Sequence, residues 1–122
     1  MSWVFRQSTG ELRHNGVLVG TGYSGKGWAP GSGRNNPLLQ GLGETGPIPA
    51  GSYNIGVAYP HPNLGSMTMN LTPVGHNALG RTLFRIHGDN SVNNASHGCV
   101  VLSPTIRTQI VTTNDRLLVV VP

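Results

Sequence analysis

The sequence predicts a mostly β fold, a sandwich or barrel-like sheet with one short helix. Three observations lead to this prediction. The 122 residues include 18 Gly and 9 Pro, a composition that suits short strands joined by many turns. Short apolar runs recur along the chain, and the Asn15-Gly16 pair between two of them marks a tight hairpin. Apolar residues at helical spacing stand out in one segment, residues 105–114.

The length predicts a single domain over residues 1–122 with a modest core. No apolar run is long enough to span a membrane, and residues 1–6 lack the charged start and apolar stretch of a signal peptide. The net charge of +4 comes from scattered basic residues without a stripe of interleaved aromatics, so nucleic acid is not an expected partner. A single cysteine excludes an intramolecular disulfide.

The N-terminal part predicts an antiparallel meander of three short strands, residues 3–7, 11–13 and 17–23. Residues 24–46 then form a long loop rich in Gly, Pro and Asn. Loops of this length in a compact domain are often binding loops or lids, and a plain connection is the alternative. Residues 46–56 predict a proline turn that leads into a strand.

The second half predicts four more strands around one helix. A turn is expected at residues 59–62 and a loop near the site at 76–80. The strands are expected at residues 67–71, 82–87, 99–102 and 116–121. Ser103 followed by Pro104 fits a helix N-cap with proline in the first turn, so the helix should occupy residues 105–114.

The stretch from residue 86 to 102 carries the residues best suited to chemistry. It contains the only cysteine, Cys99, and two of the five histidines, His87 and His97. His87 ends one apolar run and Cys99 begins the next, so strand ends facing each other would bring their side chains together. A free thiol has a pKa near ~8.5, and a neighbouring imidazole lowers that pKa to give a nucleophilic thiolate. Alkylation of Cys99 is therefore expected to titrate well below ~8.5.

Small residues around these two side chains suggest further roles. The N–H groups of Gly98 and Cys99 could point at a developing oxyanion. The carbonyl of Gly88 could accept the ring N–H of His87 and fix its tautomer.

Two other interpretations compete with a catalytic site. A lone cysteine is often a small buried hydrophobe. Zinc is the second alternative, because His87, His97, Cys99 and Asp89 are all possible ligands, although their spacing is not a common structural zinc pattern. A nucleophile, a base and oxyanion donors in one motif favour catalysis, with no metal and no cofactor expected.

The pattern His-Gly at 87–88 followed by Ser-His-Gly-Cys at 96–99 resembles the active-site motif of the L,D-transpeptidases, which have the YkuD-like fold. Residues 46–56 are similar to the Thr-Pro-x-Gly-x-Tyr/Phe segment of the same family, and the resemblance covers roughly residues 17–121. It implies an L,D-transpeptidase-like β-sandwich or barrel with the short helix after the nucleophile. It also implies that Cys99 is the nucleophile, that His87 is the base and that His97 lines the site.

Two departures from the family pattern indicate, in turn, a trimmed active-site loop and a changed contact with the substrate carboxylate. The spacer between the two halves of the motif is short, and Val101 stands where the family commonly has Arg or Asn. We assign substrate contacts to Tyr23, Ser96 and Arg107. Arg107 either faces the site in place of the missing arginine or faces solvent.

The resemblance implies a cysteine acyl-transfer enzyme that acts on peptidoglycan tetrapeptide stems, as an L,D-transpeptidase, an L,D-carboxypeptidase or both. The short His-Gly-Asp and Ser-His-Gly-Cys form is similar to L,D-transpeptidase-related toxins delivered into rival bacteria by type VI secretion. The expected location is then the periplasm of a target bacterium, with an immunity protein and a secretion-machine component as candidate partners. A non-catalytic cell-wall-binding module and a zinc-site protein remain the alternatives.

Overall fold

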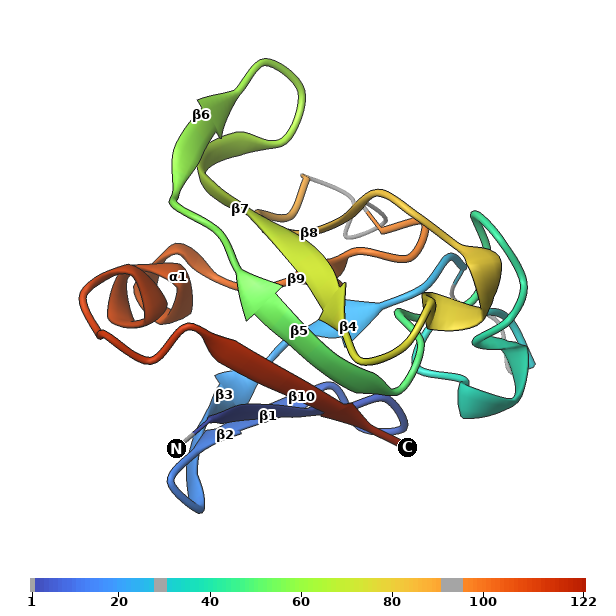
Figure 1. The fold of residues 1–122 in the computed structure, drawn as a ribbon. Coiled ribbons are helices and arrows are strands. Elements are labelled where there is room, and N and C mark those ends of the chain that lie inside the picture. The colour runs from blue at the N-terminus through green and yellow to red at the C-terminus, as the bar shows by residue number, and fades with distance from the viewer. Residues whose placement is uncertain (1, 28–30, 91–95) are drawn as a thin grey trace.

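A computed structural model describes residues 2–27, 31–90 and 96–122 of the chain. Residues 28–30 of the expected long loop and residues 91–95 of the motif spacer lie outside these ranges, as does Met1. The described residues form a curved ten-stranded sheet with one α-helix (Figure 1). The predicted mostly β fold with a barrel-like sheet is therefore confirmed.

The elements have the following bounds. The strands are β1 (Trp3–Arg6), β2 (Glu11–His14), β3 (Val17–Thr21), β4 (Tyr23–Ser24), β5 (Gly51–Ile55), β6 (Tyr59–His61), β7 (Gly65–Val74), β8 (Phe84–His87), β9 (Val100–Val101) and β10 (Leu117–Val121). The helical segments are α1 (Pro104–Val111) and two 3-10 turns, η1 (Pro37–Leu39) and η2 (Ala78–Gly80). No helix in the described part of the chain is long and apolar enough to cross a membrane.

The sheet nearly closes on itself at Gly22. Its strand order is β3-β2-β1-β10-β5-β7-β8-β9-β4, with β6 paired to β7 outside this path. The strands at the two ends of that order, β3 and β4, are separated by Gly22 alone in the sequence. A Cβ atom on Gly22 would lie 2.0 Å from the carbonyl oxygen of Val101 on β9, so only glycine permits this approach. The position explains why the predicted strand 17–23 is divided into two.

Two strand pairs are parallel, and one of them determines the geometry of the site. The antiparallel pairing of β1 with β2 and of β2 with β3 confirms the predicted meander. Strand β1 pairs in parallel with β10, and β8 pairs in parallel with β9 through Ile86↔Val100 and His87↔Val101. The chain passes from β8 to β9 through residues 88–99.

The turn predicted at residues 59–62 is wrong, because Tyr59–His61 form strand β6. This strand pairs with β7 through Tyr59↔Thr68 and His61↔Gly65, and the register shifts between the two pairs. Pro60 lies at that irregularity, where its missing N–H does not interrupt a continuous ladder. Strand β7 is also longer than predicted, since it runs from Gly65 to Val74.

The core is formed by apolar side chains on alternate residues of the strands. Its members are all nearly inaccessible to solvent and include Trp3, Phe5, Tyr53, Met69, Phe84, Ile86, Val100 and Leu118. Helix α1 adds Ile106 and Ile110, and the predicted N-cap is present, since Ser103 Oγ accepts a hydrogen bond from Ile106 N at 3.3 Å. The helix ends at Val111, three residues before the predicted end.

Candidate active site

The parallel pairing of β8 and β9 places Cys99 and His87 on the same face of the sheet. Ile86 and Val100 are paired in register and both belong to the core. Because side chains alternate along a strand, His87 and Cys99 both point to the opposite face. Extending the register by one residue sets Cys99 beside Arg85 and diagonal to His87.

His87 is held as a neutral imidazole with one nitrogen available. Its Nδ1 atom lies 2.7 Å from the carbonyl oxygen of Gly88. A carbonyl can only accept, so Nδ1 carries the hydrogen and Nε2 presents its lone pair. The side chain is buried, and this burial lowers the pKa of His87, with a further lowering by the charge of Arg107. A neutral imidazole with a free Nε2 can act as a proton acceptor.

The Cys99 thiol is protonated in the resting protein. Its sulfur donates a hydrogen bond to the carbonyl oxygen of Leu83 at 3.8 Å. Burial raises the pKa of the thiol, although the backbone amide and charge of Arg85 and the charge of Arg81 act against this rise. The expectation of a thiol pKa well below ~8.5 is therefore wrong. Burial outweighs the favourable charges, and the sulfur contacts a carbonyl rather than the His87 ring.

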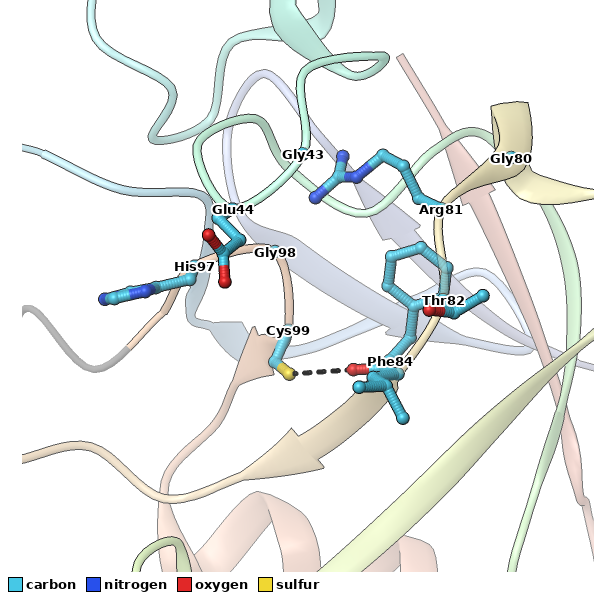
Figure 2. A pocket seen from close by; sticks show the side chains of 10 residues that line it. Gly43, Glu44, Gly80, Arg81, Thr82, Phe84, His97, Gly98 and Cys99 are labelled. Carbon is cyan, nitrogen blue, oxygen red and sulfur yellow. Dashed lines mark hydrogen bonds between the residues drawn. The ribbon is translucent and has the colours of Figure 1, made fainter.

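The thiol opens into a hollow of about 410 Å³ (Figure 2). His87 does not line this hollow and borders a second one. The walls of the first hollow come from three segments, residues 43–44, 80–84 and 97–99. Gly80 among them confirms that the loop predicted at 76–80 lies near the site. His87, Gly88 and Asp89 line the second hollow. His97 is exposed and lines both hollows, so it stands where the two meet.

The Ser96 side chain is buried and holds the backbone around Cys99. Its Oγ accepts hydrogen bonds from Gly25 N at 2.9 Å and Gly98 N at 3.2 Å, and it donates to the Cys99 carbonyl at 2.6 Å. The side chain is 1 % exposed. In the structure Ser96 therefore holds the turn that presents Cys99, and the Gly98 N–H is already bonded to a hydroxyl. The oxyanion role of Gly98 stays a prediction.

Tyr23 and Arg107 line a third hollow that does not include the thiol. The Tyr23 hydroxyl donates to Asp89 Oδ1 at 2.7 Å, two residues beyond His87. Arg107 donates from Nε to the carbonyl of Leu102 at 3.1 Å and from Nη1 to the carbonyl of Ser66.

The solvent-facing alternative for Arg107 is wrong, because the residue is only 5 % exposed. Its Nη2 packs against the backbone of Gly88, where a Cβ atom would lie 2.8 Å away. Tyr23 and Arg107 thus fix the segment that follows the imidazole, and their predicted contact with substrate stays a prediction.

Sequence reasoning missed Arg81, which lines the hollow beside Cys99. Its Nη1 donates to the carbonyls of Gln40 at 2.6 Å and Pro47 at 2.7 Å, and its Nη2 donates to the carbonyl of Gly46 at 3.1 Å. No pattern in the sequence distinguishes this arginine from a surface one. Its distinguishing feature is the set of hydrogen bonds to the segment 40–47, which only the structure reveals.

The described residues offer no group of three or more His, Cys, Asp or Glu side chains placed to hold a metal ion. The zinc alternative based on His87, His97, Cys99 and Asp89 therefore has no assembled ligand set in that part of the chain.

A barrel-like sheet with a thiol and an oriented imidazole on one face defines a candidate cysteine-nucleophile domain. In comparisons with known proteins, the family model of the Tlde1 domain matches residues 19–121. The chain therefore belongs to the Tlde1 domain family, a family of type VI secretion effectors, and this membership implies secreted delivery to target cells. No curated protein matches the chain.

The raised thiol pKa gives a direct prediction. The rate of Cys99 alkylation by iodoacetamide should titrate with a midpoint above the free-thiol value of ~8.5, because burial disfavours the thiolate. Cys99 is the only cysteine, so the total rate of thiol loss measures this residue alone. A midpoint near 6 or 7 would instead show that an ion pair exists in the resting protein.

Proposed function

We propose that this protein is a cysteine acyl-transfer enzyme that acts on peptidoglycan tetrapeptide stems, as an L,D-carboxypeptidase, an L,D-transpeptidase or both. One observation carries the proposal. Cys99 shares a sheet face with His87, and the Nδ1 contact of His87 with Gly88 O leaves Nε2 as the basic nitrogen. Membership in the Tlde1 domain family supports a toxin that is delivered to other cells.

The reaction would proceed through a thioester. His87 Nε2 takes the proton of the Cys99 thiol, and the sulfur adds to the carbonyl carbon that precedes the terminal D-amino acid. The carbonyl electron pair moves to oxygen and forms an oxyanion. Collapse of the oxyanion breaks the C–N bond, and the departing amine receives the proton from the His87 imidazolium. Water then releases the shortened stem, or an amine receives the acyl group.

The resting protonation states suit a site that is activated by its substrate. Burial favours a neutral thiol at Cys99 and a neutral imidazole at His87, so proton transfer must accompany binding or attack. Catalytic hydrogen bonds are often loose in unliganded proteins and tighten in the complex. The charges of Arg81 and Arg85 stabilise the thiolate once it forms.

Removing the nucleophile should abolish turnover without unfolding the protein. Cys99→Ala is expected to leave no detectable processing of purified muropeptides, measured by mass spectrometry, because no other thiol exists in the chain. His87→Ala should lower the rate by about 10²–10⁴-fold, the usual contribution of a general base. His97→Ala should have a smaller effect, since His97 lines the hollow with its ring pointing away from the Cys99 sulfur (Figure 2).

Ser8→Ala, at an exposed turn position that lines none of the three hollows, is the matched control and should retain full activity. Thermal unfolding of each variant separates loss of chemistry from loss of fold. Full activity in Cys99→Ala would exclude the proposed mechanism.

Toxicity should depend on the compartment, because the proposed substrate lies outside the inner membrane. In a Gram-negative host, the protein fused to a periplasmic export signal should inhibit growth or deform cells. The same chain without that signal should be harmless. Shortened or exchanged stems would be poor donors for cross-linking, which accounts for the expected damage.

Exported Cys99→Ala is the control for this experiment and should be innocuous. Growth curves and microscopy provide the measurement. Equal toxicity of the cytoplasmic and exported forms would show that the target is not the cell wall.

A further inference from the structure

The structure leaves the oxyanion of the proposed reaction short of one donor. The Cys99 N–H precedes the β8–β9 ladder, which begins at Val100, and is one of the two oxyanion donors that the sequence predicts. The neighbouring Gly98 N–H is donated to Ser96 Oγ at 3.2 Å. Ser96 is buried and also bonds Gly25 N and the Cys99 carbonyl, so the backbone turn depends on it. A second group that points into the hollow is therefore needed.

Arg81 lies directly against the backbone of Gly98. A Cβ atom on Gly98 would be 2.3 Å from Arg81 Nη2, so the absence of a side chain allows the guanidinium to approach the residue beside the nucleophile. Gly98 also has a φ of +133°, a conformation that favours glycine. Figure 2 shows the guanidinium extending over the ring of Phe84 toward the side of the hollow that carries Gly98. The distance from the guanidinium carbon to the ring centroid is 5.5 Å.

The Arg81 guanidinium is held in place by hydrogen bonds and still has unused N–H donors. An arginine has five N–H groups. In Arg81, three of them bond the carbonyls of Gln40, Gly46 and Pro47. Within the described part of the chain this leaves the Nε–H and one Nη2–H without a hydrogen-bond partner. A donor that is already held in place needs no reorganisation when charge develops, which is the main requirement of an oxyanion site.

The charge of Arg81 is not neutralised by an ion pair. The two salt bridges between described residues join Arg13 to Glu11 and His14 to Asp115, both away from the hollow. Glu44 lines the same hollow but is exposed to solvent, where its charge is screened. The partners of Arg81 are neutral carbonyls, so its positive charge remains available to an anion.

We propose that Arg81 and the Cys99 N–H together bind the oxyanion, with Arg81 taking the donor role predicted for the Gly98 amide. This inference rests on the proposed acyl transfer. When the sulfur adds to the carbonyl carbon, a C–S bond forms and the carbonyl π pair moves to oxygen. Arg81 donates N–H hydrogen bonds to that oxygen and keeps all its protons. When the oxyanion collapses, its electron pair re-forms the C=O bond, the C–N bond breaks and His87 protonates the leaving amine.

Two small reagents can isolate this role. Iodoacetamide alkylates the thiol by displacing iodide, without forming an oxyanion. p-Nitrophenyl acetate acylates the same thiol through a tetrahedral oxyanion. Because Cys99 is the only cysteine, both rates report on one sulfur, with Cys99→Ala as the blank. The ratio of acylation to alkylation cancels changes in the thiolate fraction and in access to the thiol, so it measures oxyanion stabilisation.

In Arg81→Gln the ratio should fall by about tenfold or more, since removal of one oxyanion donor typically costs 10²–10³-fold. Arg81→Lys should lower the ratio by less, because an ammonium keeps the charge but loses the fixed planar donors. Arg13→Gln, the same substitution at a distant exposed arginine, should leave the ratio unchanged. If Arg81→Gln loses its cooperative unfolding transition, Arg81→Lys decides the question.

Equal losses in both rates, or no loss in either, would overturn the role of Arg81 and leave it as an anchor of the segment 40–47. The outcome is independent of the substrate, because neither reagent is a muropeptide. An Arg81-dependent ratio in a protein that leaves muropeptides intact would contradict the proposed substrate alone. Muropeptide processing with an unchanged ratio would contradict the oxyanion role alone.

Discussion

The parallel pairing of β8 with β9 is the constraint on which the site depends. The pair Ile86↔Val100 directs both side chains into the core and so directs His87 and Cys99 to the opposite face. A slip of one residue would bury the thiol in the core and leave a valine on the site face, because strand side chains alternate. Parallel strands require a crossover, and near the end of this one the Ser96 hydroxyl holds the backbone before Cys99.

Both glycines of the motif are backed by an arginine. Gly88 lies against Arg107 and Gly98 lies against Arg81, each so closely that a Cβ atom would collide with the guanidinium. Arg107 supports the turn that supplies the carbonyl partner of His87, and Arg81 joins the segment 40–47 to the wall beside Cys99. The two positive charges act on different groups. Arg107 disfavours the charged form of His87, and Arg81 favours the anionic form of the Cys99 sulfur.

Local signals in the sequence were sufficient for much of the fold. The Asn15-Gly16 turn predicts the β2–β3 hairpin because few residues other than asparagine and glycine adopt positive φ, and both do so here. Ser103 and Pro104 predict the start of α1 because the N-cap and first helical position have strong preferences. The His-Gly and Ser-His-Gly-Cys motif likewise identifies the residues that the structure places around adjoining hollows.

Properties that depend on tertiary packing could not be predicted in this way. The parallel register of β8 and β9 follows from the whole strand order, and the irregular edge that allows Pro60 in β6 exists only beside β7. The thiol pKa depends on how deeply Cys99 is buried, which no neighbour in the sequence reveals. The hydrogen-bond partners of Arg81 are backbone carbonyls that are distant in the sequence, and a backbone carbonyl carries no side-chain signature.

Covalent acylation of Cys99 by a stem peptide can be detected by rapid acid quenching followed by intact-protein mass spectrometry. After mixing with a purified tetrapeptide muropeptide, the account predicts an adduct whose mass equals that of the substrate less its terminal D-amino acid. Proteolysis should locate this adduct on the peptide that contains Cys99. Release of the terminal amino acid without any adduct over the whole time course, or an adduct on another residue, would contradict the account.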